Sequence, residues 1–93
     1  MIIDRQELSD RIWELFKPDK TKGQGSIGKI VHYVEADNYL QILYTYGIET
    51  IKALLGLFLE YEDYETCALI RDTVEKHNKA TGKNYKLTDD SNS

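Results

Sequence analysis

The chain of 93 residues contains one cysteine and one proline, and it has no long apolar run. A single cysteine excludes an internal disulfide and a cysteine-based zinc site, because such a site needs about four ligands. The longest apolar run, Ala53 to Leu59, is interrupted by Gly56 and is far shorter than the ~20 residues that cross a bilayer. The first residues lack the basic and apolar regions of a signal peptide. These absences predict a soluble cytoplasmic protein with no membrane attachment, metal or cofactor.

The size and composition of the chain favour one folded domain. Apolar residues make up 41% of the sequence, and the net charge is −4, so the chain has enough apolar content to fold and too much acid for general polyanion binding. We expect a single helical domain over residues 1–82, followed by a polar tail over residues 83–93 that lacks periodicity and is weakly held.

Apolar residues recur at helical spacing along most of the chain. Asp4 and Glu7 have the spacing of a capping box at the start of a first helix, which Pro18 ends. The apolar positions of the successive stripes are Leu8, Ile12, Leu15 and Phe16, then Ile27, Ile30, Val31 and Val34, then Leu40, Leu43, Tyr44, Ile48, Ile51, Leu55 and Phe58. We expect Asp37 to cap the third stripe and Gly47 to kink or break it. The pattern predicts a mainly α fold, a compact bundle of four or five helices.

Residues 29–46 also allow a different structure. This stretch is rich in Ile, Val, Tyr and Thr, and Asp37 and Asn38 have the composition of a turn. A β-hairpin over residues 29–46 would make the fold α+β. The helical spacing accounts for more of the apolar positions, so the helical interpretation is favoured.

The most distinctive segment is Asp63-Tyr64-Glu65-Thr66-Cys67-Ala68-Leu69-Ile70-Arg71-Asp72-Thr73-Val74. It resembles the UVR motif, a short helical hairpin of excinucleases B and C and of some stress regulators, in which small residues and an Arg-Asp pair recur at these positions. Cys67 replaces an alanine of that pattern. The resemblance covers about residues 48–77 and is stronger in the second half. It implies an antiparallel pair of helices, 48–61 and 64–80, that serves as a docking element between proteins.

The turn of this hairpin is acidic and rich in tyrosine. Two tyrosines stand among four carboxylates in residues 60–65, a combination suited to an aromatic anchor surrounded by charges that attract a basic surface. The alternative is that Tyr64 packs in the core and that the turn is an ordinary polar hairpin tip. The predicted partner-binding residues are Tyr61, Glu62, Asp63, Tyr64, Glu65, Arg71 and Asp72.

A second candidate site is the basic, glycine-rich segment 17–29. Residues Gly23 to Lys29 match the spacing of nucleotide-binding loops. No strand precedes them, and Ile30 stands where a P-loop needs a hydroxyl group, so a flexible connector is favoured. Backbone N–H groups ahead of a helix would still suit a single phosphate. The residues predicted to contact phosphate or nucleic acid in this alternative are Lys17, Lys20, Lys22 and Lys29.

The sequence offers no catalytic set. His32 and His77 fall on separate helices, and Cys67 and His77 would stand about 15 Å apart along one helix. We therefore expect a non-enzymatic protein-binding module, an inhibitor or adaptor that docks on a larger bacterial protein or ribonucleoprotein complex. Its size and acidity are similar in type, though not in sequence, to phage-encoded anti-CRISPR proteins. The alternatives are nucleic-acid binding through segment 17–29 and self-association through an exposed Leu/Tyr face.

Overall fold

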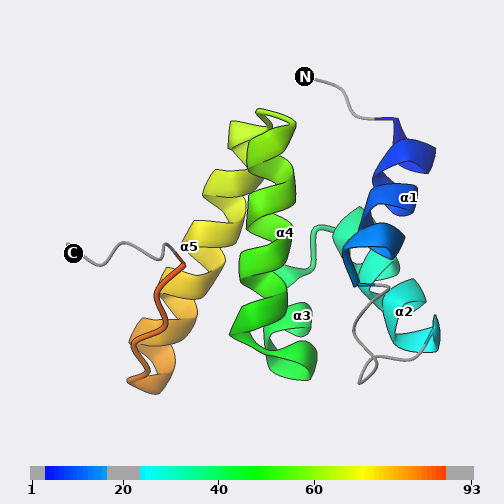
Figure 1. Cartoon of the computed structure of the whole chain (residues 1–93). Helices are drawn as coiled ribbons and strands as arrows, with labels where there is room; N and C mark the ends of the chain where they lie inside the picture. The colour runs from blue at the N-terminus through cyan, green and yellow to red at the C-terminus, as the bar shows by residue number, and fades with distance from the viewer. Residues whose placement is uncertain (1–3, 17–23, 88–93) are drawn as a thin grey trace. The chain divides into compact units, whose positions relative to one another are not determined.

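The computed structural model describes residues 4–16 and 24–87, and every regular element in these residues is an α-helix (Figure 1). The five helices are α1 (Arg5–Phe16), α2 (Gln24–Glu35), α3 (Tyr39–Tyr46), α4 (Ile48–Glu60) and α5 (Tyr64–Thr81). The prediction of a mainly α fold with four or five helices is confirmed. The chain divides into two units, Met1–Asn38 and Tyr39–Ser93. Each unit is described by itself, and the single domain expected over residues 1–82 stays a prediction.

The first unit is a pair of packed helices, α1 and α2. Asp4 begins α1 as predicted, because its Oδ1 atom accepts a hydrogen bond of 3.0 Å from the backbone N–H of Gln6. An ion pair of 2.8 Å joins Arg5 of α1 to Glu35 at the end of α2. Leu15 is exposed, so the apolar stripe of α1 is narrower than the sequence predicts. The buried side chains of this unit are Ile12, Phe16, Ile27, Ile30 and Val34.

The connection from α2 to α3 corrects one expectation. Asp37 does not precede α3 as its cap; it ends α2 in the left-handed conformation, with φ of 55°. Its N–H donates to the carbonyl of Val34, and the N–H of Asn38 donates to the carbonyl of Tyr33. This pair of hydrogen bonds is a Schellman motif, which satisfies carbonyls at the end of a helix. Asn38, rather than Asp37, stands directly before α3.

Residues 29–46 are helical, so the β-hairpin alternative is wrong. Residues 29–35 belong to α2 and residues 39–46 form α3. The expected break at Gly47 is confirmed: this glycine has φ of 93° and separates α3 from α4. Leu40 and Tyr44, which the sequence assigns to the apolar stripe, are exposed, because a helix of eight residues buries only the side that faces its neighbours.

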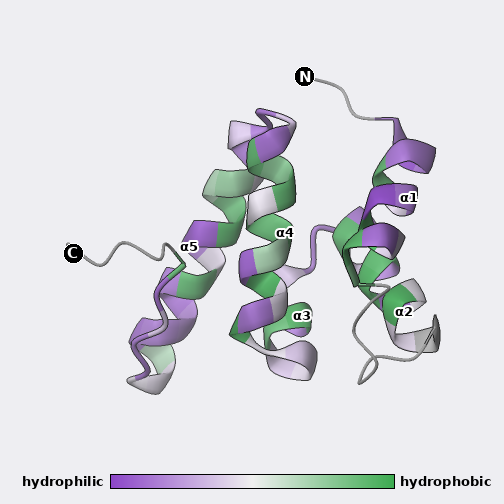
Figure 2. Cartoon of the chain, viewed as in Figure 1, coloured by the Kyte–Doolittle hydropathy of each residue, from purple (hydrophilic) through white to green (hydrophobic). Residues whose placement is uncertain are grey.

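The second unit is built from α3, α4 and α5, each of which packs against the other two. Helices α4 and α5 lie side by side and are joined by a tight turn (Figure 1). They form the antiparallel pair expected from the sequence, and their bounds differ from the expected ones by one residue at most. Figure 2 shows apolar residues along both helices and hydrophilic residues at the turn between them. The largest buried side chains here include Tyr39, Phe58, Ile51, Leu54 and Ile70.

Candidate functional site

The candidate site is the end of the α4–α5 pair, residues 60–65, called the hairpin tip below. Its backbone is fixed by two consecutive capping structures. Glu62 is left-handed, with φ of 58°, and donates its N–H to the carbonyl of Leu59. The N–H of Asp63 donates to the carbonyl of Phe58, which completes a Schellman motif. The carboxylate of Asp63 then caps α5 by accepting hydrogen bonds from the N–H and the hydroxyl of Thr66. The tip therefore presents its side chains from a well-supported turn.

The two tyrosines of the hairpin tip differ in exposure. Tyr64, the first residue of α5, is 61% exposed, so the alternative that places it in the core is wrong. Tyr61 is half-buried, and its hydroxyl oxygen is enclosed. Tyr64 is thus the aromatic side chain of the tip that is open to a partner, whereas Tyr61 is partly enclosed.

Five of the carboxylates of this region fall into two groups. Residues 60–75 contain six acidic side chains and one basic side chain. Asp63 caps α5, Asp72 pairs with Lys76 at 3.2 Å, and Glu75 pairs with Lys79 at 3.4 Å. The side chains of Glu62 and Glu65 are exposed and have no hydrogen-bond or ion-pair partner within residues 4–16 and 24–87. These two carboxylates flank the exposed Tyr64.

Three apolar side chains near the hairpin tip were not predicted as site residues. Leu59 lies in the last turn of α4, and Ala68 and Leu69 follow on α5; all three are exposed. Ala68 and Leu69 line an open hollow of about 630 Å³, together with Glu65, Arg71, Asp72 and Glu75. The helical spacing could have predicted the exposure of Leu69. The buried stripe of α5 includes Cys67, Ile70 and Val74, and Leu69 lies off that stripe.

Arg71 and Asp72 are both exposed on α5. Both were predicted from the sequence to bind a partner, and Asp72 forms an ion pair with Lys76 within α5. Ion pairs of this i,i+4 kind contribute little to stability at an exposed site. Arg71 lines the open hollow beside Leu69, where its guanidinium is accessible to a partner.

The titratable side chains that catalysis would need are poorly placed. Cys67 is fully buried, and burial raises the pKa of its thiol; the nearby Arg71 opposes this effect, while Asp63 adds to it. A thiol held in its neutral form is a weak nucleophile. His77 is also buried, between the rings of Tyr44 and Tyr85 at centroid distances of 5.2 and 5.9 Å. His32 is exposed on α2, in the other unit.

Most of the basic segment predicted as the alternative site lies outside the described residues. This applies to Lys17, Lys20 and Lys22. Lys29 is exposed on α2. Helix α2 begins at Gln24, so residues 24–29 of the glycine-rich motif are helical, and the flexible connector favoured from the sequence is wrong for these residues.

Two structural features and the comparisons with known proteins bear on the class of site. Within residues 4–16 and 24–87, no group of three or more His, Cys, Asp or Glu side chains is placed to hold a metal ion. None of the described helices has both the length and the apolar character needed to cross a membrane. No family model matches the chain, and no match was found among curated proteins or solved structures.

Proposed function

We propose that this protein is a non-enzymatic binding module that docks on another protein through the hairpin tip. The observation that supports this proposal most strongly is that Tyr64 is 61% exposed and stands in the sequence between two exposed acidic residues, Glu62 and Glu65. Exposed tyrosine is favoured as an anchor in protein interfaces, because it buries a large area at a small cost in side-chain entropy. The capped turn holds that anchor in place before binding, which reduces the entropy lost on association.

The charge of the tip defines the kind of partner. With four acidic side chains and no basic side chain in residues 60–65, the hairpin tip attracts a basic protein surface and repels nucleic acid. Proteins that bind nucleic acid carry such basic surfaces. The proposal is therefore an inhibitor or adaptor that occupies a basic face of a bacterial nucleic-acid-handling complex in the cytoplasm. The type-level likeness to phage-encoded anti-CRISPR proteins and the resemblance to the UVR docking hairpin point the same way.

The test is capture of partners from a nuclease-treated bacterial lysate by the tagged chain. The variant Glu62→Gln/Glu65→Gln removes two negative charges at the tip. Its matched control, Glu7→Gln/Glu14→Gln, removes two from exposed positions of α1. The proposal predicts a protein that the control retains and the tip variant loses, and whose binding weakens with added salt. Equal capture by both variants would contradict the role of the tip. Capture of nucleic acid alone would favour the basic segment 17–29 instead.

A further inference from the structure

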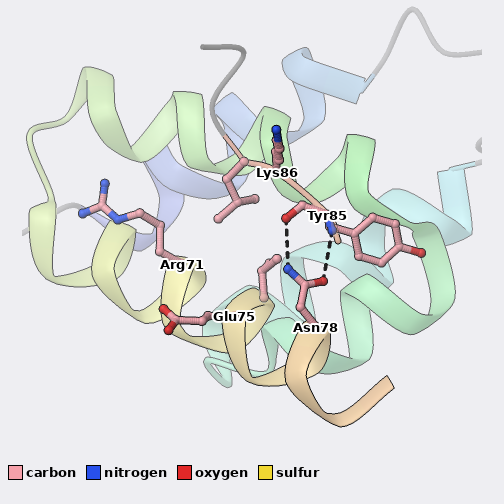
Figure 3. Close-up of a pocket in the computed structure, with 7 residues that line it drawn as sticks. Arg71, Glu75, Asn78, Tyr85 and Lys86 are labelled. Atoms are coloured by element: carbon pink, nitrogen blue, oxygen red, sulfur yellow. Dashed lines mark hydrogen bonds between the residues drawn. The ribbon is translucent and has the colours of Figure 1, made fainter. Parts of the chain in front are cut away.

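The segment that follows α5 is held against that helix by a pair of hydrogen bonds to one side chain. The Nδ2 atom of Asn78 donates to the backbone carbonyl of Tyr85 at 3.0 Å, and the N–H of Tyr85 donates to Oδ1 of Asn78 at 3.1 Å. Figure 3 shows the two bonds running between the amide of Asn78 and the main chain of Tyr85. A residue whose N–H and C=O both bond to the same neighbour has the pairing of a strand residue in an antiparallel sheet. Asn78 therefore binds main chain in an extended conformation. These two bonds do not depend on which side chain the bound residue carries.

Separate contacts select the side chain at the position that Asn78 holds, which is called the clamped position. The ring of Tyr85 stacks on the imidazole of His77, with centroids 5.9 Å apart and planes inclined by 10°. The ring of Tyr44 contacts the same imidazole edge-on at 5.2 Å. Lys83 approaches the hydroxyl of Tyr85 at 3.2 Å and lies 5.4 Å from the ring centroid. Ring stacking and cation–π contact both favour an aromatic residue at this position.

The segment leaves room beside it. A hollow of about 390 Å³ lies along the same flank of α5, lined by Arg71, Val74, Glu75 and Asn78 of the helix and by residues 85–87. Arg71, Glu75 and Lys86 border it in Figure 3. Its lining includes the apolar side chains of Val74 and Leu87. The flank of α5 thus has a main-chain clamp, an aromatic platform and the helix side of a hollow whose other side is formed by residues 85–87.

We propose that this flank, formed by Val74, His77 and Asn78, is a binding groove for an extended peptide with an aromatic residue at the clamped position. Residues 83–87 occupy the groove in cis and compete with such a segment from a partner protein. Main-chain pairing with an extended peptide, made specific by a side-chain pocket, is a known mode of peptide recognition. The groove does not involve Glu62, Tyr64 or Glu65, so its test does not depend on docking through those three residues; Arg71 and Glu75 line both the hollow of the groove and the open hollow near the tip.

Binding of the tethered residues 83–87 gives an estimate of the affinity for a free peptide. A segment joined to its site by a short linker has an effective concentration in the millimolar range. For the tethered segment to be bound most of the time, its dissociation constant as a free peptide must be about 1 mM or lower. A free peptide that competes with the tethered segment must then be raised at least about twofold to reach the same occupancy, because the factor is one plus the ratio of effective concentration to dissociation constant.

The test uses the full chain, labelled with ¹⁵N, and an acetylated peptide with the sequence of residues 82–87. The variant Tyr85→Ala removes the stacking ring of the tethered segment. The variant Tyr85→Pro removes the backbone N–H that donates a hydrogen bond to Asn78, so it vacates the groove by an independent route. In both variants we expect the peptide to shift the amide signals of Val74, His77 and Asn78, with half-saturation at about 1 mM or below. The wild-type chain should need at least about twice as much peptide for the same shift.

Two controls make the outcome specific. A peptide with alanine in place of tyrosine should produce no saturable shift at the same positions. Adding Asn78→Asp to the Tyr85→Ala chain removes the amide donor and should weaken binding at least about tenfold. The absence of saturable shifts at about 5 mM peptide in both vacated variants, or equal binding of the alanine peptide, would overturn the proposal. Light scattering tests whether the groove binds a second copy of the chain. A doubled mass for the wild-type chain that Tyr85→Ala abolishes would assign the groove to that copy and overturn the assignment to a partner.

Discussion

The carboxylate of Asp63 accepts two hydrogen bonds from Thr66, one from its backbone N–H at 3.3 Å and one from its hydroxyl at 2.7 Å. These bonds begin α5 one residue after the Schellman motif that ends α4. The same carboxylate therefore fixes the direction in which α5 leaves the turn, and with it the position of Tyr64. Stability of the cap and presentation of the anchor are coupled in this arrangement.

Loss of the cap should be measurable as a loss of stability. We predict that Asp63→Ala lowers the free energy of unfolding by about 1 kcal/mol, because the N–H of Thr66 loses its acceptor. Asp63→Asn keeps an acceptor oxygen and should lose much less. Urea unfolding followed by circular dichroism checks both variants. Equal stability of Asp63→Ala and the wild-type protein would show that the cap contributes nothing.

Thr50 carries a buried hydroxyl group that makes no hydrogen bond within the described residues. Its side chain is buried, and within residues 4–16 and 24–87 its Oγ1 atom has no hydrogen-bond partner. Thr50→Val replaces the hydroxyl by a methyl group of similar size, so we predict a stability gain of about 1 kcal/mol. Thr73→Val is the control, because the hydroxyl of Thr73 donates to the carbonyl of Leu69 at 2.8 Å. A loss of stability in Thr50→Val would mean that the hydroxyl is satisfied in solution.

Two glycines should respond to the same substitution with opposite signs. Gly56 lies exposed within α4, and a Cβ atom added there meets nothing within 4 Å; Gly56→Ala should stabilise the protein by about 1 kcal/mol. Gly82 ends α5 with φ of 75°, a conformation that costs an alanine about 1–2 kcal/mol. Gly82→Ala should therefore destabilise. Thermal unfolding of both variants checks the pair, and a shift of the same sign in both would contradict the assigned backbone conformations.

The buried thiol of Cys67 predicts a loss of stability at alkaline pH. Burial raises the pKa of Cys67 in the folded chain above the value of about 8.5 expected in the unfolded chain. Above that pH the unfolded chain releases the thiol proton first, so ionisation favours unfolding. The stabilising contribution is complete below about pH 8.5 and declines as the pH rises further. Between pH 8 and 10 the wild-type protein should lose more stability than Cys67→Ala. Parallel pH dependence in urea unfolding would contradict the burial of this thiol.

The α4–α5 hairpin could be predicted because its signals are local. Asp63 carries a capping side chain, Gly82 permits the left-handed conformation, and Gly47 interrupts the apolar spacing. Each signal acts over a few residues and needs no knowledge of the rest of the fold. Asp37 was misassigned because an Asp before a helix resembles a cap, whereas here it ends the preceding helix in the left-handed conformation. The sequence alone does not separate these two roles.

Features that depend on contacts between segments could not be predicted from the sequence. The exposure of Tyr64 depends on how α5 is rotated about its axis against α4. The presence of an aromatic residue in the first turn of a helix does not predict that rotation. The clamp between Asn78 and Tyr85 joins a side chain to main chain seven residues away, and such contacts leave no periodic pattern. Tyr44 matched the apolar stripe of α3 but lies at its edge, against His77.

The most direct test of docking through the hairpin tip compares two tyrosines of nearly equal exposure. Tyr64 is 61% exposed at the tip, and Tyr44 is 64% exposed on α3. Binding of the captured partner should be measured by calorimetry with Tyr64→Ala and Tyr44→Ala, after circular dichroism has confirmed equal helix content. We predict that Tyr64→Ala weakens binding at least about tenfold, as expected for an interface anchor, and that Tyr44→Ala leaves it unchanged. Unchanged affinity in Tyr64→Ala would contradict docking through the hairpin tip.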